Sequence, residues 1–258
     1  MIILVLNSGS NGNAVYVESR TTGDAVLLDC GISHRRILQR LRQRGKSLDT
    51  VKAIFITHEH GDHVRGLRVT TKYHPVPVYM TRGTRDYLPS RKLISNIRVI
   101  APGEDVAVGS LRVRAYRKPH DAWDPVFFHV SSPGGSFLYA TDLGSVTGDL
   151  QALLASVDAA LLESNYEPDL LWNGPYPEDL KVRIDSEVGH LSNPDCFELV
   201  AGHANGSLKH LIFGHVSENN NSPDHVESLA QQLLRHRPGF SPRIHFASRH
   251  DAGEVIEL

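Results

Sequence analysis

The segment THEHGDHVRG, residues 57–66, overlaps the end of the apolar run KAIFIT, residues 52–57, and it constrains the chain more than any other feature. An apolar run of this length next to polar residues is typical of a buried strand, and the loop after a strand can turn several side chains to one side. The loop carries three histidines and an aspartate: His58, His60, Asp62 and His63. Because imidazole and carboxylate are ligands of zinc, manganese and iron, this segment predicts one half of a metal site.

Three further candidate ligands stand at the ends of apolar runs. These are His120 in RKPHDAWDP, Asp142 in YATDLGS and His215 in IFGHVSENNNSP. Each alone is more often a turn residue, because His and Asp are common in loops. The repeated placement favours ligands, and seven candidates are too many for one four-coordinate ion. They favour two ions about 3.5 to 4 Å apart with open positions.

The order of apolar runs predicts the fold class. Hairpin-like runs dominate the first third, and strands alternate with helices afterwards, which favours two mixed β-sheets flanked by helices over one parallel sheet. With no linker or repeat, we expect one domain over residues 1–258. The expected strands are 1–6, 14–19, 25–31, 52–57, 75–80, 96–100, 111–118, 126–132, 136–142, 158–164, 210–217, 243–248 and 253–258. The expected helices are 34–46, 64–74, 82–93, 149–157, 193–207 and 222–236.

Composition excludes several classes of protein. The chain is 40% hydrophobic and 22% charged, which is typical of a globular protein rather than a disordered or membrane one. The start MIILVL lacks a basic flank and a cleavage-like segment, so we interpret it as a strand rather than a signal sequence. No apolar run approaches the roughly 18 to 20 residues of a spanning helix, which predicts a cytoplasmic protein with no membrane partner. Cys30 and Cys196 form no disulfide framework and are expected to be buried thiols.

Charge is divided unevenly along the chain. The net charge is −2, but residues 1–129 hold 20 basic and 11 acidic residues, for +9, and residues 130–258 hold 7 and 18, for −11. Much of the excess lies in the predicted helix 34–46. One interpretation is a solvated helix face whose buried stripe is Ile37, Leu38 and Leu41. The other is a basic surface that steers an anionic polymer.

The candidate ligands resemble a known family. HxHxDH at 58–63, followed by an isolated His, an Asp in TDLG and a late His, is similar to the metallo-β-lactamase fold superfamily over nearly the whole chain. The resemblance implies an αβ/βα four-layer sandwich. It also implies a ligand set in which His58, His60 and His120 hold the first ion, Asp62, His63 and His215 hold the second, and Asp142 bridges them. Asp29 in LLDCG matches the family's acidic residue behind the ligands, which orients an imidazole N–H.

A more specific resemblance is to the YycJ/WalJ-like nucleases, and more distantly to the RNase Z and phosphodiesterase branch. The segments that carry it are NSGSNGNAVYVES, KPHDAWDP, LLESNYEPDLL, GHLSN and HVSENNNSP. It implies a phosphodiesterase or nuclease with two divalent ions, zinc or manganese, that uses a metal-bridging hydroxide. The implied substrate is a nucleic acid, DNA more than RNA, digested by an exonuclease from 5′ to 3′.

The same resemblance implies roles beyond the metal ligands. Asp62, His190 and Glu163 are the expected catalytic residues. In RNase Z-like enzymes a histidine placed like His190 contacts the scissile phosphate, and a glutamate placed like Glu163 supports it. His190 also precedes a predicted helix whose N-cap is Ser192 or Asn193, a position that favours anions. The expected substrate-binding residues are Ser10, Asn11, Gly12, Asn13 and Asn219, since SGSNGN can present backbone N–H groups to a phosphate.

Two other functions stay open at this point. A thioesterase or lactonase, similar to glyoxalase II, uses the same ligands on the same fold. A binding protein with a structural metal is the second alternative. It fits less well, because a structural site is closed and uses one four-coordinate ion.

Overall fold

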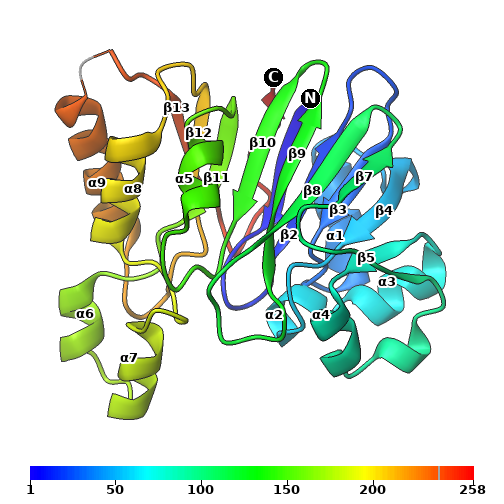
Figure 1. The fold of residues 1–258 in the computed structure, drawn as a ribbon, viewed down its shortest axis with the longest axis horizontal. Helices are drawn as coiled ribbons and strands as arrows, with labels where there is room; N and C mark the ends of the chain where they lie inside the picture. The colour runs from blue at the N-terminus through cyan, green and yellow to red at the C-terminus, as the bar shows by residue number, and fades with distance from the viewer. Residues whose placement is uncertain (238) are drawn as a thin grey trace. The chain divides into compact units, whose positions relative to one another are not determined.

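The computed structural model describes residues 1–237 and 239–258 (Figure 1). Its residues group into two units. The first unit comprises Met1–Arg117, Ala122–Ser136 and Ala247–Leu258, and the second comprises Lys118–Asp121 and Phe137–Phe246. The expectation of one domain over residues 1–258 stays a prediction.

The first unit contains most of the strands. These are β1 (Ile2–Asn7), β2 (Ala14–Glu18), β3 (Ala25–Leu28), β4 (Val51–Phe55), β5 (Val78–Met80), β6 (Ile97–Val99), β7 (Asp105–Val108), β8 (Leu111–Arg117), β9 (Val126–Ser132) and β14 (Ile256–Glu257). Its helices are α1 (His34–Gln43), η1 (Leu48–Thr50), α2 (Gly61–Val64), α3 (Leu67–Tyr73), α4 (Arg82–Tyr87) and η2 (Arg91–Leu93).

The second unit is richer in helices. Its strands are β11 (Ala159–Glu163), β12 (His210–Gly214), β13 (Arg243–Phe246) and the part of β10 (Gly135–Ala140) that begins at residue 137. Its helices are α5 (Gly148–Leu154), α6 (Pro168–Asn173), α7 (Glu178–Ile184), α8 (Asn193–His203) and α9 (Pro223–His236). Helices α8 and α9 lie side by side in this unit (Figure 1).

Both sheets mix strand directions. Over the described residues the strands form two seven-stranded sheets, in the orders β14-β1-β2-β3-β4-β5-β6 and β13-β12-β11-β10-β9-β8-β7. In the first, β1, β2, β3 and β14 pair antiparallel while β3 to β6 run parallel. In the second, β10 to β13 run parallel and β7 to β9 antiparallel. The predicted class of two mixed sheets flanked by helices is confirmed.

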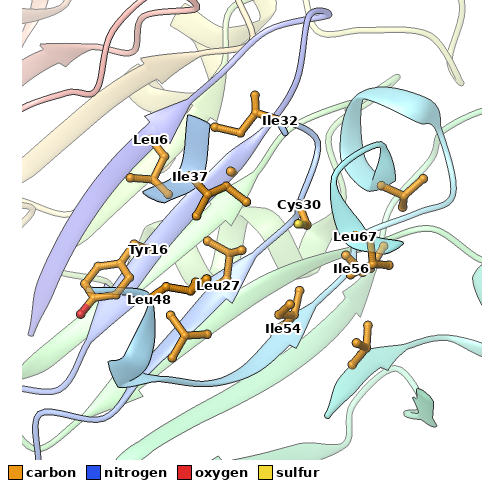
Figure 2. Packing of buried hydrophobic residues seen from close by; sticks show 14 of the residues in the cluster. Leu6, Tyr16, Leu27, Cys30, Ile32, Ile37, Leu48, Ile54, Ile56 and Leu67 are labelled. Carbon is orange, nitrogen blue, oxygen red and sulfur yellow. The ribbon is translucent and has the colours of Figure 1, made fainter. Parts of the chain in front are cut away.

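An apolar cluster joins α1 to the first sheet. Every residue of β3 is buried, as expected for a strand with both faces covered. Ile37 and Leu41 of α1 are buried in the same cluster as Leu6 and Leu27, and Figure 2 shows Ile37 lying between those two leucines. The apolar stripe predicted for this helix is therefore confirmed.

Several expected elements differ from those observed. The expected helix 82–93 is divided into α4 and η2, because Pro89 lacks the N–H that a helix interior needs and restricts Leu88 to an extended conformation. Strand β7 and helices α6 and α7 were not predicted, since each has at most seven residues and shows little periodicity. Cys30 and Cys196 are buried thiols, as predicted. Among the described residues, no helix has both the length and the apolar character needed to cross a bilayer.

Arg40 is the one arginine of α1 whose environment differs from the predicted solvated face. It is 5% exposed. Its guanidinium donates to the backbone oxygen of Leu6 at 2.5 Å, to the side-chain oxygen of Asn7 and to the backbone oxygen of His250. Arg40 therefore ties the end of β1 to the C-terminal segment of the first unit, and it is not part of a basic surface.

We expect Arg40→Ala to lower the free energy of unfolding by about 3 kcal/mol, because three buried acceptors lose a charged donor. Arg42→Ala is the matched control, since Arg42 lies exposed on the same helix, and its effect should stay within about 0.5 kcal/mol. Urea unfolding followed by circular dichroism measures both. Equal losses in the two variants would contradict a structural role specific to Arg40.

Candidate metal centre

The first set of candidate ligands is placed by two parallel strands, β3 and β4. Leu28 pairs with Phe55, and the N–H of Asp29 donates to the oxygen of Phe55 at 2.8 Å, so the ends of the two strands meet. Asp29 has a φ of 58°, a left-handed conformation that costs free energy in a residue other than glycine. That conformation turns its carboxylate toward the residues that follow β4.

Asp29 and Thr57 fix the rings of two histidines. The buried Asp29 accepts from the Thr57 hydroxyl at 3.0 Å and from Nδ1 of His63 at 2.7 Å. Nδ1 of His58 lies 2.9 Å from the Thr57 oxygen. Because the carboxylate only accepts, the hydroxyl proton points to Asp29 and the Thr57 oxygen accepts from His58. Both imidazoles therefore carry their proton on Nδ1 and keep the Nε2 lone pair for a metal.

His60 and Asp62 lie in the same loop. The ring centroid of His58 is 4.6 Å from that of His60 and 4.0 Å from that of His63. A carboxylate oxygen of Asp62 lies 3.4 Å from Nε2 of His63. The loop packs so closely on Gly31 that a Cβ there would lie 1.6 Å from the backbone oxygen of Asp62. Only glycine fits at that position.

Asn13 contacts this ligand loop. Its side-chain N–H₂ lies 3.3 Å from the Asp62 carboxylate and 3.1 Å from Nε2 of His63, and its side-chain oxygen accepts from the N–H of Gly9. The structure therefore places Asn13 against two candidate ligands.

Several backbone N–H groups of the glycine-rich turn, residues 7–13, already donate hydrogen bonds within the protein. Among the described residues, the N–H groups of four turn residues already have acceptors: Ser8, Gly9, Gly12 and Asn13. A phosphate at this turn would have to be met chiefly by Ser10, which is exposed, and Asn11. Asn11 itself donates its side-chain amide to the backbone oxygen of Arg249.

The second unit brings together candidates at the carboxyl ends of β10, β11 and β12. These strands are parallel neighbours, so Asp142, Glu163 and His215 lie at the same edge of the sheet. Asp142 and His215 have φ values of 54° and 53°. An oxygen of Asp142 lies 3.6 Å from Nε2 of His215 and 3.9 Å from Nε2 of His120. Strained backbone of this kind gathers at functional sites.

Glu163 is fully buried and orients two histidines. One of its oxygens accepts from Nδ1 of His215 at 2.7 Å and from Nδ1 of His190 at 2.9 Å. Its other oxygen accepts from the N–H groups of Leu143 and Leu191. Burial alone would raise the pKa of Glu163, but the imidazoles of His190 and His215 lower it to about 2. The side chain is therefore an anion that holds both rings in place.

His120 and His190 differ in exposure. Nδ1 of His120 donates to the backbone oxygen of Gly189 at 3.0 Å, and burial lowers the pKa of His120 to about 4 although Asp142 opposes this. The His190 side chain is 20% exposed and lines a cavity of about 490 Å³ in the second unit. The N-cap of α8 is Ser192, whose hydroxyl accepts from the backbone N–H of Asp195. His190 therefore lies just before a helix N-terminus and is reachable from solvent.

The donor chemistry fits divalent metal ions. Each of four candidate histidines has Nδ1 held by an oxygen acceptor, which leaves Nε2 as the ligand atom: His58, His63, His120 and His215. Within the second unit, ligand atoms of Asp142, Glu163, His190 and His215 all lie within 4.8 Å of one another. These are nitrogen and oxygen donors suited to zinc or manganese.

Sequence reasoning missed three polar residues of the site. Thr57 joins Asp29 to His58, and Asn165 donates to the backbone oxygen of His215 at 2.7 Å. Lys118, whose side chain is fully buried, lies 3.9 Å from Asp142 and donates to the oxygen of Thr141. The sequence signal that could have identified Lys118 is its position two residues before the candidate ligand His120. Asn219, an expected substrate contact, is exposed and donates to the Tyr176 hydroxyl at 2.7 Å.

Known proteins are similar to this chain over most of its length. A family described as the beta-lactamase superfamily domain matches residues 24–215. Exodeoxyribonuclease WalJ of Streptococcus pneumoniae serotype 2 strain D39 is 30% identical over 235 residues, which cover 89% of this chain and 85% of WalJ. Exodeoxyribonuclease YycJ of Bacillus anthracis is 30% identical over 238 residues, which cover 90% of this chain and 89% of YycJ.

A solved structure shows the same fold. Zinc-bound PqqB from Methylobacterium extorquens superimposes with a TM-score of 0.76 at 18% identity, and the match covers 100% of both chains. At that identity the likeness concerns the fold alone.

Proposed function

This chain belongs to the β-lactamase superfamily and is a metal-dependent hydrolase, and on that premise we propose that it is a nuclease that removes nucleotides from DNA in the 5′ to 3′ direction. The observation that carries the proposal is the length of the similarity to two exodeoxyribonucleases, about nine-tenths of this chain in each case. A similarity confined to the metal ligands would fit a thioesterase or a lactonase equally well.

The candidate ligands divide into two sets under this proposal. His58, His60 and His120 would hold one ion, Asp62, His63 and His215 would hold the other, and Asp142 would serve both. The fixed Nδ1 protons of four of these histidines support the assignment. Two such ions, when bound, would lower the pKa of bound water to supply a nucleophile at neutral pH and would neutralise charge on the phosphoryl oxygens.

His190 is proposed to act on the phosphate. Glu163 accepts its Nδ1–H, so Nε2 is the nitrogen left to meet a substrate oxygen. A proton held at Nε2 can be donated to the phosphoryl oxygen or to the leaving group, a role worth about 10²- to 10⁴-fold in rate. The Glu163 anion orients the ring of His190 in the way that a carboxylate orients a catalytic histidine elsewhere. Asp62 is proposed to be both a metal ligand and a catalytic residue.

The proposal is tested with metal-stripped protein refilled separately with manganese and with zinc. Single- and double-stranded DNA and RNA are labelled at the 5′ end in one series and at the 3′ end in another. The stripped protein should be inactive, and refilled protein should release the 5′ label first as a mononucleotide and shorten the 3′-labelled strand progressively.

A thioester and a lactone are assayed alongside as controls. Turnover of either without any cleavage of polynucleotide would overturn the nuclease proposal while keeping a hydrolase. Release of the 3′ label first would contradict only the proposed direction.

A further inference from the structure

Two exposed aromatic rings in the first unit lie outside the ligand sets described above. Tyr87 and Trp123 stack with ring centroids 3.8 Å apart and an interplanar angle of 5°. They are nevertheless 51% and 52% exposed. Folding favours burial of rings this large, and an exposed aromatic pair is the kind of apolar surface that marks a binding site.

The backbone around Trp123 is anchored on two sides. The N–H of Trp123 donates to the Glu59 carboxylate at 2.9 Å, and its backbone oxygen accepts from the Thr84 hydroxyl at 3.3 Å. The Thr81 hydroxyl donates to the backbone oxygen of Asp124 at 2.8 Å. These contacts hold the backbone of Trp123 in place, and stacking on Tyr87 orients its indole before any ligand arrives, which reduces the entropy lost on binding.

The residues that contact the backbone of Trp123 and Asp124 are restricted in type. Asp124 adopts a left-handed φ of 57°. A Cβ on Gly83 would lie 2.8 Å from the backbone oxygen of Trp123 and 2.6 Å from Asp124, so glycine is required there. Glu59, which anchors Trp123, stands between the candidate ligands His58 and His60. The aromatic pair is therefore joined directly to the ligand loop of the first unit.

Positive charge lies on both sides of Tyr87 along the chain. Residues 81–98, which include α4 and η2, hold five basic residues and one acidic residue, for a net charge of +4. Arg82, Arg91 and Lys92 are exposed. The single acid, Asp86, is already paired with Arg85 at 2.7 Å. An anionic partner with flat apolar groups is the ligand that fits both the charge and the rings.

We propose that Tyr87 and Trp123 form a stacking platform for a base of a single-stranded polynucleotide, whose phosphates contact the basic residues of α4 and η2. The inference rests on the proposed nuclease function and adds how that enzyme holds its substrate. Stacking on aromatic side chains beside a basic surface is how proteins bind single strands without sequence preference. Bases inside a duplex are stacked on one another, so the platform favours single strands.

Tryptophan fluorescence tests the platform directly, because the chain has only two tryptophans. In Trp172→Phe protein, the remaining emission comes from Trp123. Single-stranded DNA oligomers with uncleavable phosphorothioate linkages should quench it, and blunt duplex of the same length should quench it less. The matched control is Trp123→Phe protein, in which the remaining emission comes from Trp172. Trp172 lies in the second unit, is 40% exposed and donates a hydrogen bond to Asp185. The emission of this control protein should not change when DNA is added.

Kinetics supply the second readout. Trp123→Ala should raise KM for a single-stranded oligonucleotide about 5- to 100-fold, with Trp123→Phe intermediate. The far-UV circular dichroism spectra of both variants should match that of the parent protein. That result shows that the variants fold.

Two results would overturn the platform: no quenching of Trp123 by single-stranded DNA or RNA, or an unchanged KM in Trp123→Ala protein that still cleaves the oligonucleotide. Failure of the nuclease proposal gives a different result, in which no polynucleotide is cleaved by the parent protein. The quenching experiment decides the platform in that case as well.

Discussion

Replacing Asp142 with alanine should abolish phosphodiester hydrolysis and remove at least one metal ion from each chain while the protein stays folded. The Asp142 carboxylate is buried and lies 3.6 Å from Nε2 of His215 and 3.9 Å from Nε2 of His120. A carboxylate has two oxygens and can serve two ions, which an imidazole cannot do through one nitrogen. Elemental analysis of the purified protein gives the metal content, and circular dichroism reports the fold.

Asp142→Asn is the sharper variant of the pair. Asp142 has a φ of 54°, which asparagine adopts at a lower cost than alanine, so the amide keeps the backbone and the volume while removing the charge. The buried Lys118 ammonium 3.9 Å from Asp142 also loses its anion in both variants. Two ions per chain together with normal turnover in Asp142→Asn protein would show that Asp142 does not serve the metals.

His190→Ala should lower kcat by about 10²- to 10⁴-fold and leave the metal content unchanged. The reason is that Nδ1 of His190 is held by Glu163, which leaves a partly exposed Nε2 free to act on substrate. His203→Ala is the matched control, because His203 lines the same cavity and should be dispensable for turnover. Rates on labelled DNA and metal content are measured for each protein.

One result would contradict the role proposed for His190. Its ligand atom lies within 4.8 Å of those of Asp142, Glu163 and His215, so a loss of metal in His190→Ala protein would identify it as a ligand. Glu163→Gln separates the two roles further. Glu163 orients His215 as well as His190, so this variant should lose rate and also bind metal more weakly.

The paired outcomes distinguish three functions for the buried polar residues. Loss of metal with loss of rate indicates a ligand, and loss of rate alone indicates contact with substrate. Loss of unfolding free energy alone, as expected for Arg40, indicates a structural role. Arg40 belongs to a helix whose sequence favours a solvated face and leaves a nucleic-acid surface open, and its burial against Leu6 and His250 removes it from any such surface.

Much of the fold was predictable because its signals are local. The run that became β3 is apolar over its whole length, and those that became β1, β4 and β11 contain one polar residue each, as expected for largely buried strands. The end of α4 is also a local signal, because Pro89 disfavours a helical conformation at Leu88, although the pattern of residues 82–93 predicts one continuous helix. The short α6 and α7 carried no comparable pattern, because packing rather than periodicity stabilises helices of this length.

The sequence by itself determined which residue types stand at the ends of which strands, including Asp29 after β3, the histidine cluster after β4, Asp142 after β10 and His215 after β12. Only the tertiary structure decided that Asp29 reaches His63 through a left-handed turn and that Glu163 serves His190 and His215 together. It likewise placed Asn13 on the ligand loop and Trp123 on Tyr87. The physical reason is that strand ends are fixed by the local alternation of side chains. A hydrogen bond or a ring contact between distant residues depends on which strands become neighbours and on the backbone conformation where they end.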